Sequence, residues 1–148
     1  MSKRTNNPLK NAAKDGKKES VNMTVLLVED NPAARLGVKL LLESYGYRVL
    51  EAVSLAEMFD IFALSVPDAV ITDYDLGANQ PNGLEVIRQI KIMMDDLPVM
   101  MYSANLCTDA GLEALARQAG ACAVLPKPFQ SDELKAMISH ALDSVATS

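Results

Sequence analysis

From residue 23 onward, short apolar runs alternate five times with segments of helical periodicity. The runs cover residues 25–28, 48–52, 69–72, 98–102 and 122–125, and the helical segments cover residues 32–45, 54–65, 84–94, 108–118 and 131–145. Strands that alternate with helices pair in parallel through right-handed crossovers. The sequence therefore predicts an α/β fold of the (βα)5 type, with a doubly wound, parallel, five-stranded sheet.

Individual residues define these elements more closely. The first, third and fourth runs are continuously apolar, as expected of strands covered on both faces, so Met100 and Met101 are core candidates. Pro126 has no N–H to donate, which predicts an edge position for the fifth strand. Ser54 begins a capping box, and Ser131 is expected to cap the last helix.

Charge is distributed unevenly along the chain. Residues 1–22 contain six Lys or Arg and two acidic residues, a balance of +4, whereas the whole chain carries −5. The rest of the chain is therefore strongly acidic, which argues against direct nucleic-acid binding. We interpret residues 1–22 as a flexible basic tail and residues 23–148 as the folded domain. Contact of the tail with an acidic partner, nucleic acid or an anionic membrane is the alternative.

Two further features bear on location. No apolar run reaches the roughly 18 residues that a membrane helix needs, and the N-terminus has no apolar signal segment. Cys107 and Cys122 are too few for a disulfide framework and are expected to be reduced thiols. The sequence therefore predicts a cytoplasmic protein.

Polar residues follow four of the five predicted strands. Glu29 and Asp30 follow the first, Asp73 the third, Ser103 the fourth and Lys127 the fifth. The carboxyl ends of the strands in an open parallel sheet face one crevice, where ligands bind. We therefore expect three carboxylates, a hydroxyl and an ammonium group to meet there.

This combination restricts the chemistry of the crevice. Two carboxylates about 4 Å apart repel by roughly 4 kcal/mol at an effective dielectric near 20, so a cation is required. Oxygen ligands favour Mg²⁺, and the only histidine, His140, lies far away on the last predicted helix. A metal ion, a carboxylate, a hydroxyl and a lysine suit phosphoryl transfer, which depends mainly on positioning and charge neutralisation.

Five segments resemble the response-regulator receiver (CheY-like) family. They are VLLVEDN (25–31), DAVITDYDL (68–76), NGLEVI (82–87), VMMYSA (99–104) and AGACAVLPKPF (119–129), and the resemblance extends over residues 23–145. It implies a flavodoxin-like sheet with strand order 2-1-3-4-5. It also implies a phosphoacceptor domain of a two-component or phosphorelay signalling system, a switch rather than an enzyme.

The resemblance assigns a role to each site residue. Asp73 resembles the phosphoacceptor, which takes its phosphoryl group from a sensor histidine kinase or a histidine phosphotransfer protein. Asp30, Asp73 and the backbone carbonyl of Asp75 would bind Mg²⁺ directly, and Glu29 would bind it through water. Ser103 resembles the hydroxyl that moves to the phosphoryl group.

Lys127 resembles the lysine that pairs with that group, and the Lys127–Pro128 bond is cis in many relatives. The resemblance places the phosphodonor near Ala34, Gly37 and Pro128. It places a downstream protein target on the face formed by residues 108–145, and it also allows a phosphorylation-dependent dimer. A stand-alone regulator is favoured over a fragment of a hybrid kinase.

Three departures from the family pattern stand out. The segment from Asp73 to Gly83 is about two residues longer than usual and lacks the proline that normally follows Leu76. Asp75 places an acidic side chain at a position that varies and influences phosphoryl lifetime. Val124 replaces the aromatic residue that rotates on activation in many relatives, so coupling of Ser103 to such a ring is not expected.

Two other functions remain as alternatives. The sequence of residues 73–75, Asp-Tyr-Asp, resembles the nucleophile motif of haloacid-dehalogenase-type phosphatases, although in that family the motif ends the first strand. A pseudo-receiver, which binds partners without carrying phosphate, is the second alternative. Nucleotide binding is the weakest hypothesis, because no glycine-rich phosphate loop follows any predicted strand.

Overall fold

The computed structural model describes residues 23–146, so the predicted basic tail 1–22 lies outside the described residues. Within these residues, five strands and five α-helices alternate, with one additional 3₁₀ helix. The elements are β1 (Thr24–Val28), α1 (Pro32–Ser44), β2 (Arg48–Ala52), α2 (Leu55–Leu64), β3 (Ala69–Asp73), α3 (Gly83–Met93), β4 (Val99–Ser103), η2 (Ala104–Cys107), α4 (Leu112–Ala119), β5 (Ala123–Pro126) and α5 (Ser131–Ala146).

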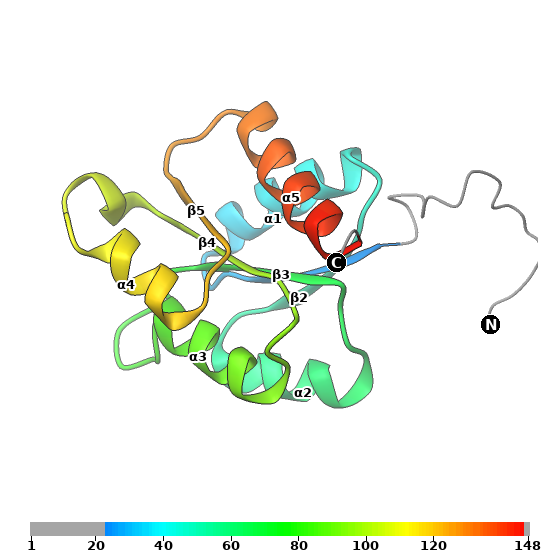
Figure 1. Cartoon of the computed structure of the whole chain (residues 1–148), viewed down its shortest axis with the longest axis horizontal. Coiled ribbons are helices and arrows are strands. Elements are labelled where there is room, and N and C mark those ends of the chain that lie inside the picture. Colours follow the sequence, from blue (N-terminus) through cyan, green and yellow to red (C-terminus); the bar gives the residue numbers. More distant parts are fainter. Residues whose placement is uncertain (1–22, 147–148) are drawn as a thin grey trace, which may run out of the picture.

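The strands form one parallel sheet in the order β2-β1-β3-β4-β5, which confirms the expected topology. Helices α1 and α5 cover one face of the sheet, and α2, α3 and α4 cover the other (Figure 1). The fifth strand lies at an edge, as Pro126 predicted.

Alternating side chains of each central strand enter two separate cores. On β4, Met101 packs toward α3 and α4, whereas Met100 and Tyr102 pack toward α1 and α5. All five residues of β3 and of β4 are buried, which confirms the prediction of strands covered on both faces. Each fully buried Leu, Ile or Met side chain contributes about 1.5–3 kcal/mol relative to an exposed one.

Two predictions about helix starts were wrong. Residues 108–118 were expected to form one helix, but α4 begins only at Leu112. The Asp109 side chain accepts a hydrogen bond from the backbone N–H of Gly111, a local turn that competes with helix formation. Ser131 is not the cap of α5 but its first residue, and Glu133 instead accepts from the N–H of Gln130.

The predicted cap of α2 is confirmed, because the Ser54 hydroxyl accepts from the N–H of Glu57. The Glu57 carboxylate reaches back to the N–H of Val53 rather than to that of Ser54. Gly120 ends α4 with a positive φ of 124°, a conformation that glycine adopts without strain.

Register brings the carboxyl ends of the strands level with one another. Val28 pairs with Thr72, Asp73 with Tyr102, and Ser103 with Pro126. The residues that leave β1, β3, β4 and β5 therefore emerge at one edge of the sheet. This edge carries the candidate site.

Candidate functional site

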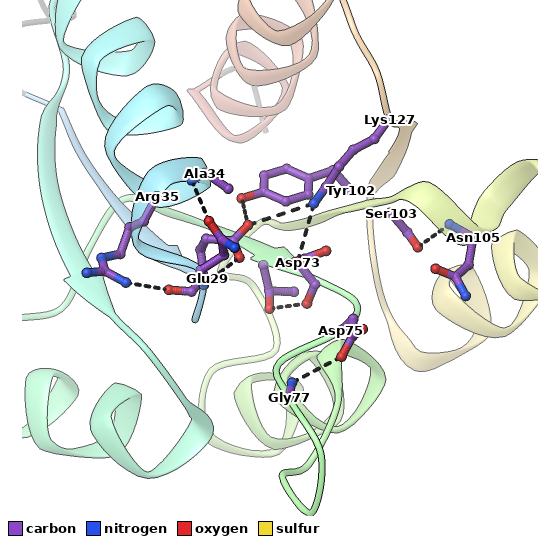
Figure 2. Close-up of polar contacts among 12 residues, drawn as sticks. Glu29, Ala34, Arg35, Asp73, Asp75, Gly77, Tyr102, Ser103, Asn105 and Lys127 are labelled. Carbon is purple, nitrogen blue, oxygen red and sulfur yellow. Dashed lines mark hydrogen bonds and ion pairs between the residues drawn. The ribbon is translucent and has the colours of Figure 1, made fainter.

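Three carboxylates meet at the carboxyl edge of the sheet. Glu29, Asp30 and Asp73 each offer one oxygen, and these oxygens lie within 4.8 Å of one another. They border a cavity of about 460 Å³, together with Asn31, Ala34, Asp75, Gly77, Ala78, Ala104, Asn105 and Lys127. The convergence of the acids with Lys127, expected from the strand ends, is therefore present (Figure 2).

Asp73 is an acid of this cluster whose surroundings raise its pKa. Asp73 is only 5% exposed, and the Lys127 ammonium lies 3.4 Å from its Oδ2. Burial, followed by the negative charge of Glu29, raises the pKa of Asp73 to about 6. The Lys127 charge and hydrogen bond, and the backbone N–H of Asp75, act in the opposite direction. Negative charge at this position is thus incompletely neutralised by the protein.

Glu29 is 1% exposed, and hydrogen bonds hold both of its carboxylate oxygens. The Tyr102 hydroxyl donates to Oε1 at 2.6 Å, and the backbone N–H of Asn31 donates to Oε2 at 3.1 Å. The backbone carbonyl of Glu29 accepts from Arg35 on α1. Figure 2 shows the hydrogen bonds that Tyr102 and Arg35 donate to Glu29.

Tyr102 is the site residue that the sequence analysis did not identify. Burial, followed by the hydrogen bond to Glu29, raises the pKa of Tyr102, so the hydroxyl remains a neutral donor. A buried tyrosine hydroxyl normally has a partner, and that rule was the available signal. Only the register of β1, β3 and β4 identifies Glu29 as the partner.

Lys127 lies between the acids and the Tyr102 ring. Its Nζ is 3.9 Å from Glu29 Oε1 and 4.7 Å from the ring centroid of Tyr102. The ammonium therefore faces two carboxylates and one aromatic face. The Lys127–Pro128 peptide bond is cis, as the resemblance implied.

Ser103 is buried at the end of β4, but its hydroxyl is directed away from the acids. Its Oγ accepts a hydrogen bond from the backbone N–H of Asn105, 2.9 Å away, and so caps η2 (Figure 2). Ser103 is not one of the described residues that border the acidic cavity. The side chain of Asp75 is exposed, and its Oδ1 accepts from the N–H of Gly77.

The loop after β3 contains two residues with a positive φ. Gly77 adopts a φ of 106°, and a Cβ atom there would lie 3.2 Å from Asp30 Oδ2. Asn79 also has a positive φ, of 65°. At the end of the loop, the Asn82 side chain caps α3, and a Cβ atom on Gly83 would lie 2.5 Å from the carbonyl oxygen of Asp73. Glycine at position 83 therefore lets α3 begin directly beside the acid cluster.

The donor set fits a hard cation. Carboxylates, carbonyls and amide oxygens border the cavity, and none of the described residues around it is His or Cys. The raised pKa of Asp73 also indicates that a bound cation would relieve repulsion among the acids. Glu29, Asp30 and Asp73 could hold such a metal ion.

Comparison with known proteins identifies the family to which this fold belongs. The response regulator receiver domain family matches residues 25–139, most of the chain. The chain belongs to this family. Receiver domains are signalling domains of two-component systems, and the phosphatase alternative is not favoured.

Individual relatives agree with this assignment. The receiver domain is 37% identical over 112 residues to the response regulator MprA of Mycobacterium sp. strain KMS, and 36% identical over 114 residues to that of Mycobacterium avium strain 104. The first match covers 76% of this chain but only 47% of the relative, so the chain spans about half the length of these curated relatives.

Solved structures give the same result. The receiver domain of NtrX from Brucella abortus has a TM-score of 0.72 at 27% identity, and covers 80% of this chain and 98% of its own. A response regulator from Thermotoga maritima has a TM-score of 0.71 at 29% identity, with 82% and 98% covered. Within residues 23–146, no helix of this receiver domain is both long and apolar enough to cross a membrane.

Proposed function

We propose that Asp73 is the phosphoacceptor of this receiver domain and takes its phosphoryl group from a phosphohistidine. The observation that carries the proposal is the position of Asp73, which is buried among two other acids with the Lys127 ammonium 3.4 Å from Oδ2. In the transfer, an Asp73 oxygen forms a P–O bond while the P–N bond of the donor breaks. The donor imidazole leaves and regains a proton.

Mg²⁺ is the proposed cofactor. Asp30, Asp73 and the backbone carbonyl of Asp75 would bind it directly, and Glu29 through water. When bound, Mg²⁺ supplies positive charge against the phosphoryl oxygens. The oxygen-only donor set around the acids supports this choice over softer metals.

Lys127 and Ser103 complete the proposed site. Lys127 already contacts the acceptor carboxylate and is placed to pair with a phosphoryl oxygen once Asp73 is modified. Ser103 donates to another phosphoryl oxygen after its hydroxyl leaves the N–H of Asn105. Movement of Ser103 would therefore release the first turn of η2, which connects phosphorylation to the segment before α4.

The proposed donor is a sensor histidine kinase or a histidine phosphotransfer protein. A largely apolar cavity of about 440 Å³ adjoins the acid cluster and is bordered by Ala34, Gly37 and Pro128, among others. Leu36 and Leu40 lie exposed on the same helix, α1. This apolar surface next to Asp73 supports docking of the donor there.

The proposed output is a contact with a downstream protein through residues 108–145, which include α4, β5 and α5. The edge position of β5 and the exposed Leu115 on α4 support this surface, and a phosphorylation-dependent dimer could use it as well. Cys107 and Cys122 are both free, which supports the proposed cytoplasmic location. Direct nucleic-acid binding by this domain is not proposed.

Incubation with Mg²⁺ and acetyl phosphate, followed by intact-protein mass spectrometry, tests the proposal. We expect wild type to gain one phosphoryl group and Asp73→Asn to gain none. A modified Asp73→Asn variant would place the acceptor elsewhere. An unmodified wild type would instead favour a pseudo-receiver.

Sustained hydrolysis of p-nitrophenyl phosphate, abolished by Asp73→Asn, would favour the phosphatase alternative. Exposed Asp60 on α2 provides the control, because Asp60→Asn removes a carboxylate far from the cavity and should leave phosphorylation unchanged.

A further inference from the structure

Tyr102 places a hydroxyl in the interior of the proposed phosphorylation site. The residue is 0% exposed, lies on β4 directly before Ser103, and donates to Glu29 Oε1 at 2.6 Å. A hydrogen bond from a neutral donor to a carboxylate is stronger than one between neutral groups. This bond connects the loop after β1 to the central part of the sheet across 73 residues of sequence.

The bond fixes the direction in which the Glu29 carboxylate points. With Oε1 held by Tyr102 and Oε2 held by the N–H of Asn31, the carboxylate cannot rotate without losing a partner. Arg35 holds the Glu29 backbone at the same time. The carboxylate is therefore set in advance at its position within 4.8 Å of the oxygens of Asp30 and Asp73.

The same side chain also contacts the lysine on the other side of the site. Lys127 Nζ lies 4.7 Å from the Tyr102 ring centroid and 3.9 Å from the Glu29 oxygen that accepts the hydroxyl. Without the hydroxyl, the Lys127 ammonium remains as a donor 3.9 Å from that oxygen. The Glu29 carboxylate would then turn toward the ammonium and away from the position that serves a cation.

We propose that Tyr102 is a positioning residue for the cation site, whose hydroxyl holds Glu29 in the orientation that Mg²⁺ binding requires. This inference rests on the proposed function, because it assumes that Glu29 binds Mg²⁺ through water. Residues that orient metal ligands in this way typically change metal affinity about 10–100-fold when they are replaced.

The Tyr102→Phe variant tests the inference, since it removes the hydroxyl and retains the ring that contacts Lys127. Mg²⁺ affinity is measured by calorimetric titration, without any phosphodonor. We expect binding to weaken about 10-fold. Tyr47→Phe is the matched control, because Tyr47 is buried in the same core as Tyr102, against the Tyr45 ring, whereas the hydrogen bonds to the Glu29 carboxylate come from Tyr102 and Asn31. It should bind Mg²⁺ like wild type.

A double-mutant cycle separates positioning from a general loss of packing. If Tyr102 acts through Glu29, then adding Tyr102→Phe to a Glu29→Gln background should change Mg²⁺ affinity less than twofold. A full 10-fold loss in that background would show that the hydroxyl acts by another route and would overturn the proposal. Far-UV circular dichroism of each variant in EDTA establishes that it is folded.

The outcome is distinguishable from failure of the proposed function. If wild type binds Mg²⁺ and is phosphorylated while Tyr102→Phe binds Mg²⁺ equally well, the role of Tyr102 is refuted and the role of Asp73 stands. If wild type itself binds no Mg²⁺, the proposed cofactor fails first.

Discussion

Replacing Asp73 with Asn should stabilise the folded domain when no divalent cation is present. Burial and the Glu29 charge raise the pKa of Asp73 from 3.8 to about 6 in the folded state. Each pKa unit corresponds to about 1.36 kcal/mol, so ionised Asp73 lowers the free energy of unfolding by about 3 kcal/mol. Asn keeps the shape of the side chain without the charge, and we expect a gain of about 2–3 kcal/mol near neutral pH.

The titration of Asp73 also determines how the free energy of unfolding changes with pH. Between about pH 4 and pH 6, folded Asp73 binds more protons than unfolded Asp73, so stability falls as the pH rises through this range. Below about pH 4 the carboxyl is protonated in both states and the penalty disappears. The difference in stability between Asp73→Asn and wild type should therefore grow from near zero at about pH 4 to its full value above about pH 6.

Urea unfolding in EDTA, followed by far-UV circular dichroism, measures this difference, since the chain has no Trp for fluorescence. Asp60→Asn, which removes an exposed carboxylate on α2, should stay within about 0.5 kcal/mol of wild type. The reasoning is refuted if Asp73→Asn is no more stable than wild type near neutral pH. An advantage of equal size at about pH 4 would also refute it.

Three further predictions concern the same edge of the sheet. Mg²⁺ should raise the melting temperature of wild type relative to EDTA, because binding relieves carboxylate repulsion; superimposable melts would count against a cation site. Lys127→Ala should lower stability in EDTA and slow phosphorylation by acetyl phosphate, because Asp73 and Glu29 lose the ammonium group that they share. An unchanged rate of phosphorylation would exclude Lys127 from the transfer. Gly83→Ala should cost about 1–3 kcal/mol in urea unfolding, because its Cβ meets the Asp73 carbonyl at 2.5 Å, and a neutral result would show that α3 shifts freely.

Helix boundaries show where local patterns were sufficient and where they were not. The Ser54 cap and the Gly120 terminus were predictable, because each depends on backbone groups within a few residues. The start of α4 was not, because the turn in which the Asp109 side chain accepts from the N–H of Gly111 keeps residues 108–111 out of the helix. Such side-chain bonds compete with the helix and leave no distinct apolar periodicity.

The candidate site also has a part that the sequence predicted and a part that only the structure revealed. Glu29, Asp30, Asp73 and Lys127 were predictable as neighbours, because the carboxyl ends of parallel strands share one edge of the sheet. Their roles in phosphoryl transfer and Mg²⁺ binding remain predictions. The direction of the Ser103 hydroxyl depended on the conformation of the following residues, which no strand pattern specifies.

The order of strands and helices follows from the sequence alone, because apolar periodicity and chain connectivity restrict a (βα)5 chain to few topologies. Tertiary packing alone decided which atoms meet. The Tyr102 hydroxyl reaches Glu29, and Lys127 lies over the Tyr102 ring, only because four strands align in one register. Contacts between residues so distant in sequence depend on the packed fold as a whole, since a one-residue slip in register would turn Tyr102 toward the opposite core.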